Sequence, residues 1–219
     1  MAQFLLPMPT ESSVNSFMER ELTDRAIVLR TTPLKESDLM ISFLSARHGK
    51  ISGIAKGARN SKRRFLGGIE VFDTGEFSLA KGRNRDSGPY LVNSLSEREL
   101  WPRLRSDLDR FRMAVTILEI SECFAPEGDA DASRLFEPLV GTLRALNLTQ
   151  RKDEALQLCA RYIYSALKIS GFDPNQDPDV PLNIRNDLPA PSLESAATAF
   201  LFLTQSCEHI LGRALRSRS

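Results

Sequence analysis

The chain of 219 residues is 42% hydrophobic and 26% charged, a composition typical of a folded protein that excludes a fully disordered chain. Its 29 Lys and Arg residues nearly balance its 28 Asp and Glu residues, so the formal net charge of +1 indicates no partner by itself. No apolar run approaches the roughly 18 residues that a membrane-spanning helix needs. Phe4-Leu5-Leu6 ends at Pro7 without a preceding basic residue, so we expect neither a membrane anchor nor a secretory signal.

The sequence pattern changes near Trp101-Pro102. Before this point β-branched and aromatic residues alternate with turn residues, and after it apolar residues recur every three or four positions. We therefore predict three parts: a partly disordered extension over residues 1–22, a strand-rich domain over 23–100, and a helical domain over 101–219 with a proline-rich loop at 173–191.

Five strands are predicted in the first domain, around residues 25–31, 39–43, 50–57, 71–81 and 90–95. Gly49 supplies a positive φ for a tight turn before the third strand. In that strand, a period of two places Ile51 and Gly53 on one face and Lys50 and Ser52 on the other. A glycine inside a strand indicates sharp curvature or a close approach. Five short strands in this length predict a small closed barrel.

Four helices are predicted in the second domain. Pro102 suits the first turn of a helix with one apolar face, made of Leu104, Leu108, Phe111, Val115 and Leu118. Asp131 is expected to cap the second helix, which Pro138 should kink or divide. The third helix should end at Gly171, and the last one carries apolar residues from Leu193 to Leu211.

A basic stretch is the most informative feature of the chain. Residues 47–64 hold seven basic residues and no acidic one, and residues 47–85 hold ten basic and three acidic residues, a local net charge of +7. Such a concentration is stabilised by a polyanion, and nucleic acid is the commonest. Phe65 and Tyr90 could stack on bases. The alternative is a solvated surface with a flexible basic loop.

No constellation for catalysis or metal binding is expected. The three cysteines, Cys123, Cys159 and Cys207, are isolated and fit a reducing cytoplasm, and Cys159 and Cys207 fall on apolar helical faces as small core residues. His48 is interpreted as a turn residue or a phosphate contact. Glu119 and Glu122, three residues apart, are interpreted as a solvated helix edge. We therefore predict a protein that is not an enzyme and holds no cofactor or metal.

Several motifs resemble the N-terminal half of the bacterial RecO family. They are Ala26-Ile27-Val28-Leu29-Arg30, Lys35-Glu36-Ser37-Asp38, Arg47-His48-Gly49-Lys50-Ile51 and Ala55-Lys56-Gly57-Ala58-Arg59, followed by Ser61 and Phe65. The helical half is also similar, through Ser170-Gly171-Phe172-Asp173-Pro174. The resemblance implies an α+β architecture, in which an N-terminal five-stranded OB-fold barrel precedes an all-helical C-terminal domain.

The same resemblance implies an activity and partners. The activity is recombination mediation in DNA repair: binding single- and double-stranded DNA, annealing complementary strands and helping to load RecA onto DNA coated with single-strand-binding protein. The implied partners are RecR and the acidic C-terminal tail of the single-strand-binding protein, and the implied location is the cytoplasm, at the nucleoid. Many relatives carry a zinc-binding Cys cluster after the Gly-Phe-x-Pro stretch. Residues 176–191 here contain no Cys, so we expect no zinc finger.

The basic stretch and the resemblance together predict the DNA contacts, which are Arg30, Lys35, Arg47, Lys50, Lys56, Arg59, Lys62, Arg63, Arg64, Lys81 and Arg83. Two other functions stay open. One is a protein-interaction adaptor whose barrel is only structural, and the other is an RNA-binding module of the same fold.

Overall fold

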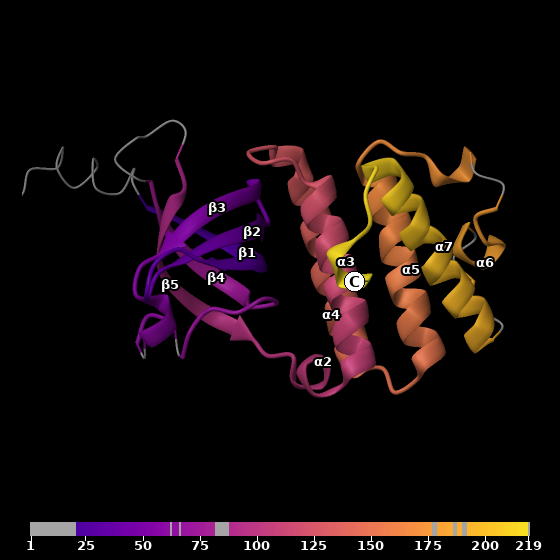
Figure 1. Cartoon of the computed structure of the whole chain (residues 1–219), viewed down its shortest axis with the longest axis horizontal. Helices are drawn as coiled ribbons and strands as arrows, with labels where there is room; N and C mark the ends of the chain where they lie inside the picture. Colours follow the sequence, from indigo (N-terminus) through magenta and orange to yellow (C-terminus); the bar gives the residue numbers. More distant parts are fainter. Residues whose placement is uncertain are drawn as a thin grey trace, which may run out of the picture.

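The structure is a computed structural model, and it describes residues 21–61, 63–65, 67–81, 88–176, 179–185, 188–189 and 192–218. The β-strands lie at one end of the molecule and the helices at the other (Figure 1). The predicted N-terminal extension falls outside the described residues, except for Glu21 and Leu22, which belong to the first strand. No helix in the part of the chain that the structure describes is long and apolar enough to cross a membrane.

The strands close into a barrel, as the sequence predicts, and their order around it is β1-β2-β3-β5-β4. β1 pairs antiparallel with both β2 and β4, and a parallel pairing of β3 with β5 closes the sheet. The five strands span Glu21–Pro33 (β1), Leu39–Ser45 (β2), Gly49–Ala55 (β3), Thr74–Ala80 (β4) and Tyr90–Glu99 (β5).

The glycines of β3 are required by close contacts. A Cβ on Gly53 would lie 2.7 Å from Val92 Cγ2 and 3.0 Å from Phe43 Cε2, so the barrel interior has no room for a side chain there. Gly49 has a φ of 65°, which confirms the left-handed turn before β3. A Cβ on Gly49 would also lie 1.8 Å from the carbonyl oxygen of Asp129, so this turn touches the helical part of the chain.

The helical part follows directly after β5. Its α-helices span Pro102–Ser106 (α2), Leu108–Phe124 (α3), Phe136–Leu148 (α4), Lys152–Ile169 (α5), Leu182–Arg185 (α6) and Leu193–Leu211 (α7). Short 3₁₀ helices span Ala58–Asn60 (η1), Ala130–Leu135 (η2), Pro174–Gln176 (η3) and Arg216–Arg218 (η4). The positive φ of Gly171 confirms the predicted end of α5, and α7 ends in the same way at Gly212, whose φ is 64°.

Two helix predictions are wrong. The first helix is broken at Asp107, whose side chain accepts a hydrogen bond from the backbone N–H of Arg110 and so caps α3. The break shifts the helical phase and leaves Leu108 64% exposed instead of buried. Asp131 does not cap the second helix, because Asp129 caps η2 and no side chain among the described residues caps α4. The predicted helix is divided where η2 meets α4, two residues before Pro138, which falls in the first turn of α4, where a missing N–H costs no helical hydrogen bond.

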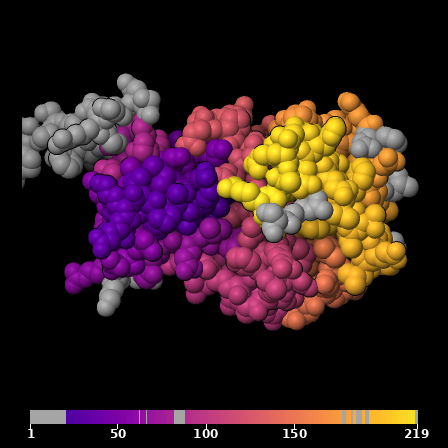
Figure 2. Space-filling model, viewed as in Figure 1, coloured from indigo at the N-terminus to yellow at the C-terminus, as the bar shows by residue number. Residues whose placement is uncertain are grey.

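The barrel and the helices share one hydrophobic core. Ile27, Leu29 and Leu44 project from the outside of the barrel and are buried against the helices. A second core fills the barrel interior, where the rings of Phe43 and Phe77 meet edge to face. Figure 2 shows the strands in direct contact with the helices, and the C-terminal segment reaching the barrel.

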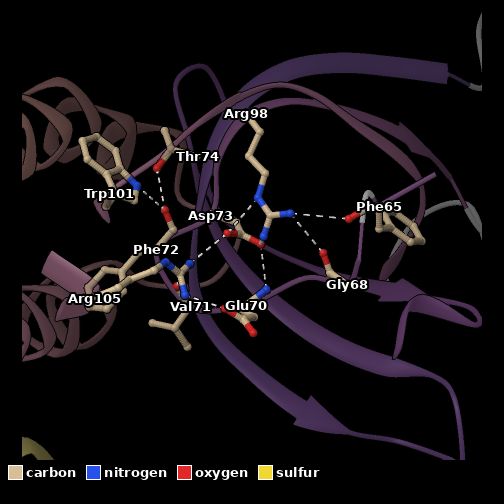
Figure 3. A network of polar contacts seen from close by, with 10 residues as sticks. All are labelled: Phe65, Gly68, Glu70, Val71, Phe72, Asp73, Thr74, Arg98, Trp101 and Arg105. Carbon is tan, nitrogen blue, oxygen red and sulfur yellow. Dashed lines mark hydrogen bonds and ion pairs between the residues drawn. The ribbon is translucent and has the colours of Figure 1, made fainter. Parts of the chain in front are cut away.

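A network of polar contacts ties the end of the barrel to α2 (Figure 3). Asp73, whose side chain is 2% exposed, accepts hydrogen bonds from Arg98 and Arg105 and from the backbone N–H of Glu70. The indole N–H of Trp101 donates to the carbonyl oxygen of Phe72 at 2.8 Å. The segment before β4 is thereby fixed to both halves of the molecule.

Candidate nucleic-acid interface

The predicted basic stretch is divided between two places on the barrel. β3 runs from one place to the other, and the six residue steps from Lys50 to Lys56 separate the two Cα atoms by about 20 Å. Arg47 and Lys50 lie at the helical end. The remaining described cations of the stretch lie at the opposite end.

The opposite end carries a group that we call the distal basic cluster: Lys35, Lys56, Arg59, Arg63 and Arg64. Backbone contacts bring these residues together although they come from two loops. The N–H of Arg59 donates to the carbonyl oxygen of Ser37 at 3.2 Å, which places η1 against the turn between β1 and β2. Asp38 supports the same contact, because its carboxylate accepts from the N–H of Gly57 at 2.8 Å.

All five side chains of the distal basic cluster are exposed, and within the described residues none of them forms an ion pair with a carboxylate. Arg59 and Arg64 donate to the backbone carbonyl oxygens of Glu36 and Lys56. These contacts orient the two guanidinium groups without neutralising them. The positive charge at this end of the barrel is therefore presented to solvent.

The segment that carries Arg63 and Arg64 is held by the barrel core and by β5. Phe65 is fully buried in the barrel core, and the N–H of Leu95 in β5 donates to the carbonyl oxygen of Arg64 at 3.1 Å. Arg98 donates to the carbonyl oxygens of Phe65 and Gly68 while it pairs with Asp73. The polar network of Figure 3 thus reaches the backbone of Phe65, the residue that follows Arg64.

The burial of Phe65 corrects its predicted role as a base-stacking residue. Its ring is 0% exposed, and the guanidinium of Arg64 lies over it with 5.2 Å between the guanidinium carbon and the ring centroid. Tyr90 is half-buried at the start of β5, opposite Gly53. The sequence pattern alone does not show which aromatic residue faces the core, so it did not distinguish the buried Phe65 from the partly exposed Tyr90.

The other predicted contacts have different surroundings. Arg47 is 72% exposed with its Nε 3.6 Å from a carboxylate oxygen of Asp24. Arg30 donates to Glu122 at 2.7 Å, and Lys50 donates to the main-chain oxygen of Glu122 at 3.0 Å, so both face the helices. Lys81 is exposed just after β4. Lys62 and Arg83 lie outside the described residues.

Glu119 and Glu122 are buried, so their interpretation as a solvated helix edge is wrong. The carboxylate of Glu119 accepts the backbone N–H groups of Arg216 and Ser217, both at 2.8 Å, and Glu122 pairs with Arg30 and Arg216. Burial raises the pKa of Glu119, but these hydrogen bonds outweigh it and hold that pKa below its ordinary value. Sequence reasoning missed this clamp because the partners lie more than 90 residues apart.

Cys159 and Cys207 are core residues of the helical part, and His48 lies beside a buried aspartate of the barrel. Cys159 and Cys207 are fully buried, which raises the pKa of each thiol to about 12. The Nδ1 atom of His48 lies 3.0 Å from a carboxylate oxygen of Asp24, next to the turn that precedes β3. Among the residues that the structure describes, no three His, Cys, Asp or Glu side chains gather where they could hold a metal ion.

Comparison with known proteins gives the family. Residues 18–88 match the model of the recombination protein O N-terminal domain. The chain is 34% identical over 149 residues to a DNA repair protein RecO from Alkaliphilus metalliredigens, a match that covers 68% of this chain and 57% of the relative. The chain belongs to the RecO family.

Two further RecO proteins give the same result. The relative from Dehalococcoides mccartyi is 32% identical over 151 residues, which is 68% of this chain and 56% of that protein. The relative from a Nocardioides species is 30% identical over 152 residues, covering 69% and 60%. The chain therefore spans a little over half the length of the curated RecO relatives that it matches. The RecO N-terminal match and the closed five-stranded barrel together confirm the predicted OB fold.

Proposed function

We propose that this chain acts in DNA repair and recombination by binding DNA at the distal basic cluster. The observation that carries the proposal is the gathering of five exposed cations, without carboxylate partners among the described residues, at one end of an OB-fold barrel. OB folds bind single strands with one sheet face and the loops beside it, and the cluster includes the loop between β1 and β2. Family membership supports the proposal, because the relatives are named DNA repair proteins.

The proposed mechanism is the holding of phosphate backbones by positive charge. Cations bound to phosphates release counterions, and this release supplies affinity without reading the base sequence. Two strands held near the same cluster pair with each other, and base pairing supplies the free energy of annealing. No covalent step is required, so we propose that the protein is not an enzyme.

The salt dependence of DNA binding tests the proposal. We expect the triple variant Arg59→Ala, Arg63→Ala and Arg64→Ala to lose about three phosphate contacts. Each contact contributes about 0.7 to the slope of log affinity against log salt on single strands, so the slope should fall by about 2. Affinity should then fall about 100-fold at about 0.1 M salt and converge with the wild type near 1 M.

A matched control removes the same charge from exposed positions of the helical part, with Arg112→Ala, Arg151→Ala and Lys152→Ala. The control should keep the wild-type slope. Equal slopes in the wild type and the barrel variant, with both proteins folded, would overturn the proposed DNA site.

The two alternatives predict different results. An adaptor with a structural barrel would bind bare DNA weakly and with little salt dependence. An RNA-binding module would prefer RNA to a DNA strand of matched sequence, because the 2′-hydroxyl group is what distinguishes the two ligands. We expect tight, salt-dependent binding of the DNA strand.

We also propose three protein partners: RecR, the single-strand-binding protein and, functionally, RecA. For the acidic tail of the single-strand-binding protein, a hollow of about 500 Å³ beside α5 and α7 is the best candidate. Leu167, Val180 and Leu203 line this hollow and provide an apolar slot for a terminal Phe. Lys168, exposed next to Leu167, is the cation that we expect to attract the acidic residues.

Binding of a tail peptide to the full chain tests this partner. We expect the affinity to fall with added salt, on Lys168→Ala and on removal of the terminal Phe of the peptide. Unchanged affinity after removal of that Phe would contradict the hollow as its site.

A further inference from the structure

A groove of about 460 Å³ lies where the barrel meets the helices, at the place that the C-terminal segment reaches in Figure 2. We call it the junction groove, and its lining residues are Arg30, Lys50, Glu122, Cys123, Arg213 and Arg216. These residues come from β1, β3, α3 and the segment after α7. The groove is therefore formed by the fold, from parts of the chain that lie far apart in sequence.

In the junction groove the negative charges are buried and the positive charges are exposed. The carboxylates of Glu119 and Glu122 lie beneath the groove, with side chains 5% and 11% exposed. The side chains of Arg30, Arg213 and Arg216 are 52%, 46% and 57% exposed, so the positive groups face the solvent. Among the described side chains, Lys50 and the three arginines are the cations, and Glu119 and Glu122 are the carboxylates that pair with the arginines.

The chemistry of this arrangement favours an anion with several oxygen atoms. Arg30 uses its Nε to bind Glu122, and its two terminal nitrogens have no hydrogen-bond partner among the described residues. A guanidinium group with both terminal nitrogens available matches the geometry of a phosphate group.

The outer face of β3 connects the groove to the distal basic cluster. Along this strand Ile51, Gly53 and Ala55 are buried, while Lys50, Ser52 and Ile54 point outward and Lys56 is exposed just beyond the strand. Lys50 lines the groove and Lys56 belongs to the cluster. One face of one strand therefore joins two positive sites whose ends are about 20 Å apart.

We propose that the junction groove is a second phosphate site of the same DNA strand, which runs from the distal basic cluster along β3 and ends between Arg30 and Arg213. This inference rests on the proposed function, because the strand is the ligand of the cluster. It makes the C-terminal segment part of the DNA-binding surface. The continuity along β3 favours a polynucleotide phosphate over free inorganic phosphate.

Cys123 allows a test on the wild-type full chain. It lies in the groove with its Sγ 2.8 Å from Arg213, and it is half-buried, whereas the other two cysteines are buried. We expect a single-stranded oligonucleotide of about 16 nucleotides, the upper end for one OB fold, to protect Cys123 from a thiol reagent. With DNA at ten times its Kd, about one tenth of the protein is free, so labelling should slow about tenfold.

Inorganic phosphate at matched ionic strength should leave the labelling rate unchanged. An unchanged rate in the presence of bound DNA, or equal protection by inorganic phosphate, would overturn the proposal. The labelled site is read by peptide mass spectrometry, so labelling of Cys159 or Cys207 is distinguished from labelling of Cys123.

Two variants should change the affinity for the oligonucleotide in opposite directions. Removal of two phosphate contacts with Arg30→Ala and Arg213→Ala should lower affinity for the oligonucleotide about 25-fold at about 0.1 M salt. Glu122→Gln should raise affinity about fivefold, since it removes a repulsion between unit charges about 4 Å apart in water. A purely structural role for the clamp would not raise affinity, so an unchanged or weaker Glu122→Gln protein contradicts the second site.

The matched control is Arg25→Ala with Arg144→Ala, two arginines that pair with Glu99 elsewhere at the junction of barrel and helices. It should bind DNA as the wild type does.

Failure of this inference is distinguishable from failure of the proposed function. Loss of binding in the distal triple variant with no protection of Cys123 would reject the groove alone. Protection of Cys123 with full binding by that variant would reject the cluster alone.

Discussion

Asp73 is the residue whose removal should damage the fold most directly through polar contacts. Its buried carboxylate accepts hydrogen bonds from Arg98, Arg105 and the N–H of Glu70, and Arg98 in turn holds the carbonyl oxygens of Phe65 and Gly68. Asp73→Ala leaves these donors without their acceptor and leaves the charge of Arg98 buried. Removal of one partner of a buried pair costs about 3–5 kcal/mol.

Because the side chain of Arg98 is 17% exposed, we expect the low end of this range, about 3 kcal/mol. With a urea dependence of about 2 kcal/mol per molar, the unfolding midpoint should fall by about 1.5 M. Asp109→Ala, which removes the carboxylate of an exposed pair with Lys152, is the control and should leave the midpoint nearly unchanged.

The pKa of Asp73 gives a reason to compare Asp73→Ala with a second variant, Asp73→Asn. Burial raises the pKa of Asp73 above its ordinary value of 3.8, against the lowering by Arg98, the N–H of Glu70 and Arg105. The folded protein therefore binds this proton more readily than the unfolded chain does, and the contribution of Asp73 to stability falls as the pH rises from 3.8 through the raised pKa. Asp73→Asn keeps an acceptor oxygen without the charge, so it should cost less than Asp73→Ala. Equal losses in the two variants, or a shift below about 0.5 M for Asp73→Ala, would refute this reasoning.

Three further outcomes are expected. Gly49→Ala should lower the free energy of unfolding by more than the 1–2 kcal/mol of a left-handed residue, because its Cβ also meets the carbonyl oxygen of Asp129. Gly67→Ala, with a φ of 104° and no atom within 4 Å of its Cβ, is the control, and equal losses in urea unfolding would contradict the contact. The lowered pKa of Glu119 contributes stability that is present above pH 4.5 and lost as the pH falls through its folded pKa, so Glu119→Gln should reduce the acid sensitivity of the urea midpoint. Elemental analysis should find no stoichiometric zinc, and a chelator should not change the Tm; about one zinc per chain would contradict the assignment of Cys159 and Cys207 to the core.

The sequence predicted the parts of the fold that depend on local rules. The alternation of β3, the left-handed turn at Gly49 and the helix end at Gly171 follow from local backbone preferences, and the structure confirms them. The break at Asp107 could also have been recognised, because Asp is a good cap for the helix that follows. The apolar spacing from Leu104 to Phe111 concealed it.

The site was predicted only in part, because charge along a chain does not show where the chain turns. Residues 47–64 are continuous in sequence, but β3 separates Lys50 from Lys56, and Lys50 faces the helices. The clamp between Glu119 and Arg216 joins residues 97 positions apart, so it left no local pattern in the sequence. Contacts of this kind come from the packing of α3 against the C-terminal segment.

The most direct test of the proposed function is the rate at which the full chain anneals complementary oligonucleotides. We expect the wild type and the helical control variant Arg112→Ala, Arg151→Ala and Lys152→Ala to accelerate annealing equally. The variant Arg59→Ala, Arg63→Ala and Arg64→Ala should anneal far more slowly at about 0.1 M salt, since it lacks about three phosphate contacts. Wild-type annealing rates in this variant, or no acceleration by the wild type over the protein-free reaction, would contradict a DNA-annealing function at the distal basic cluster.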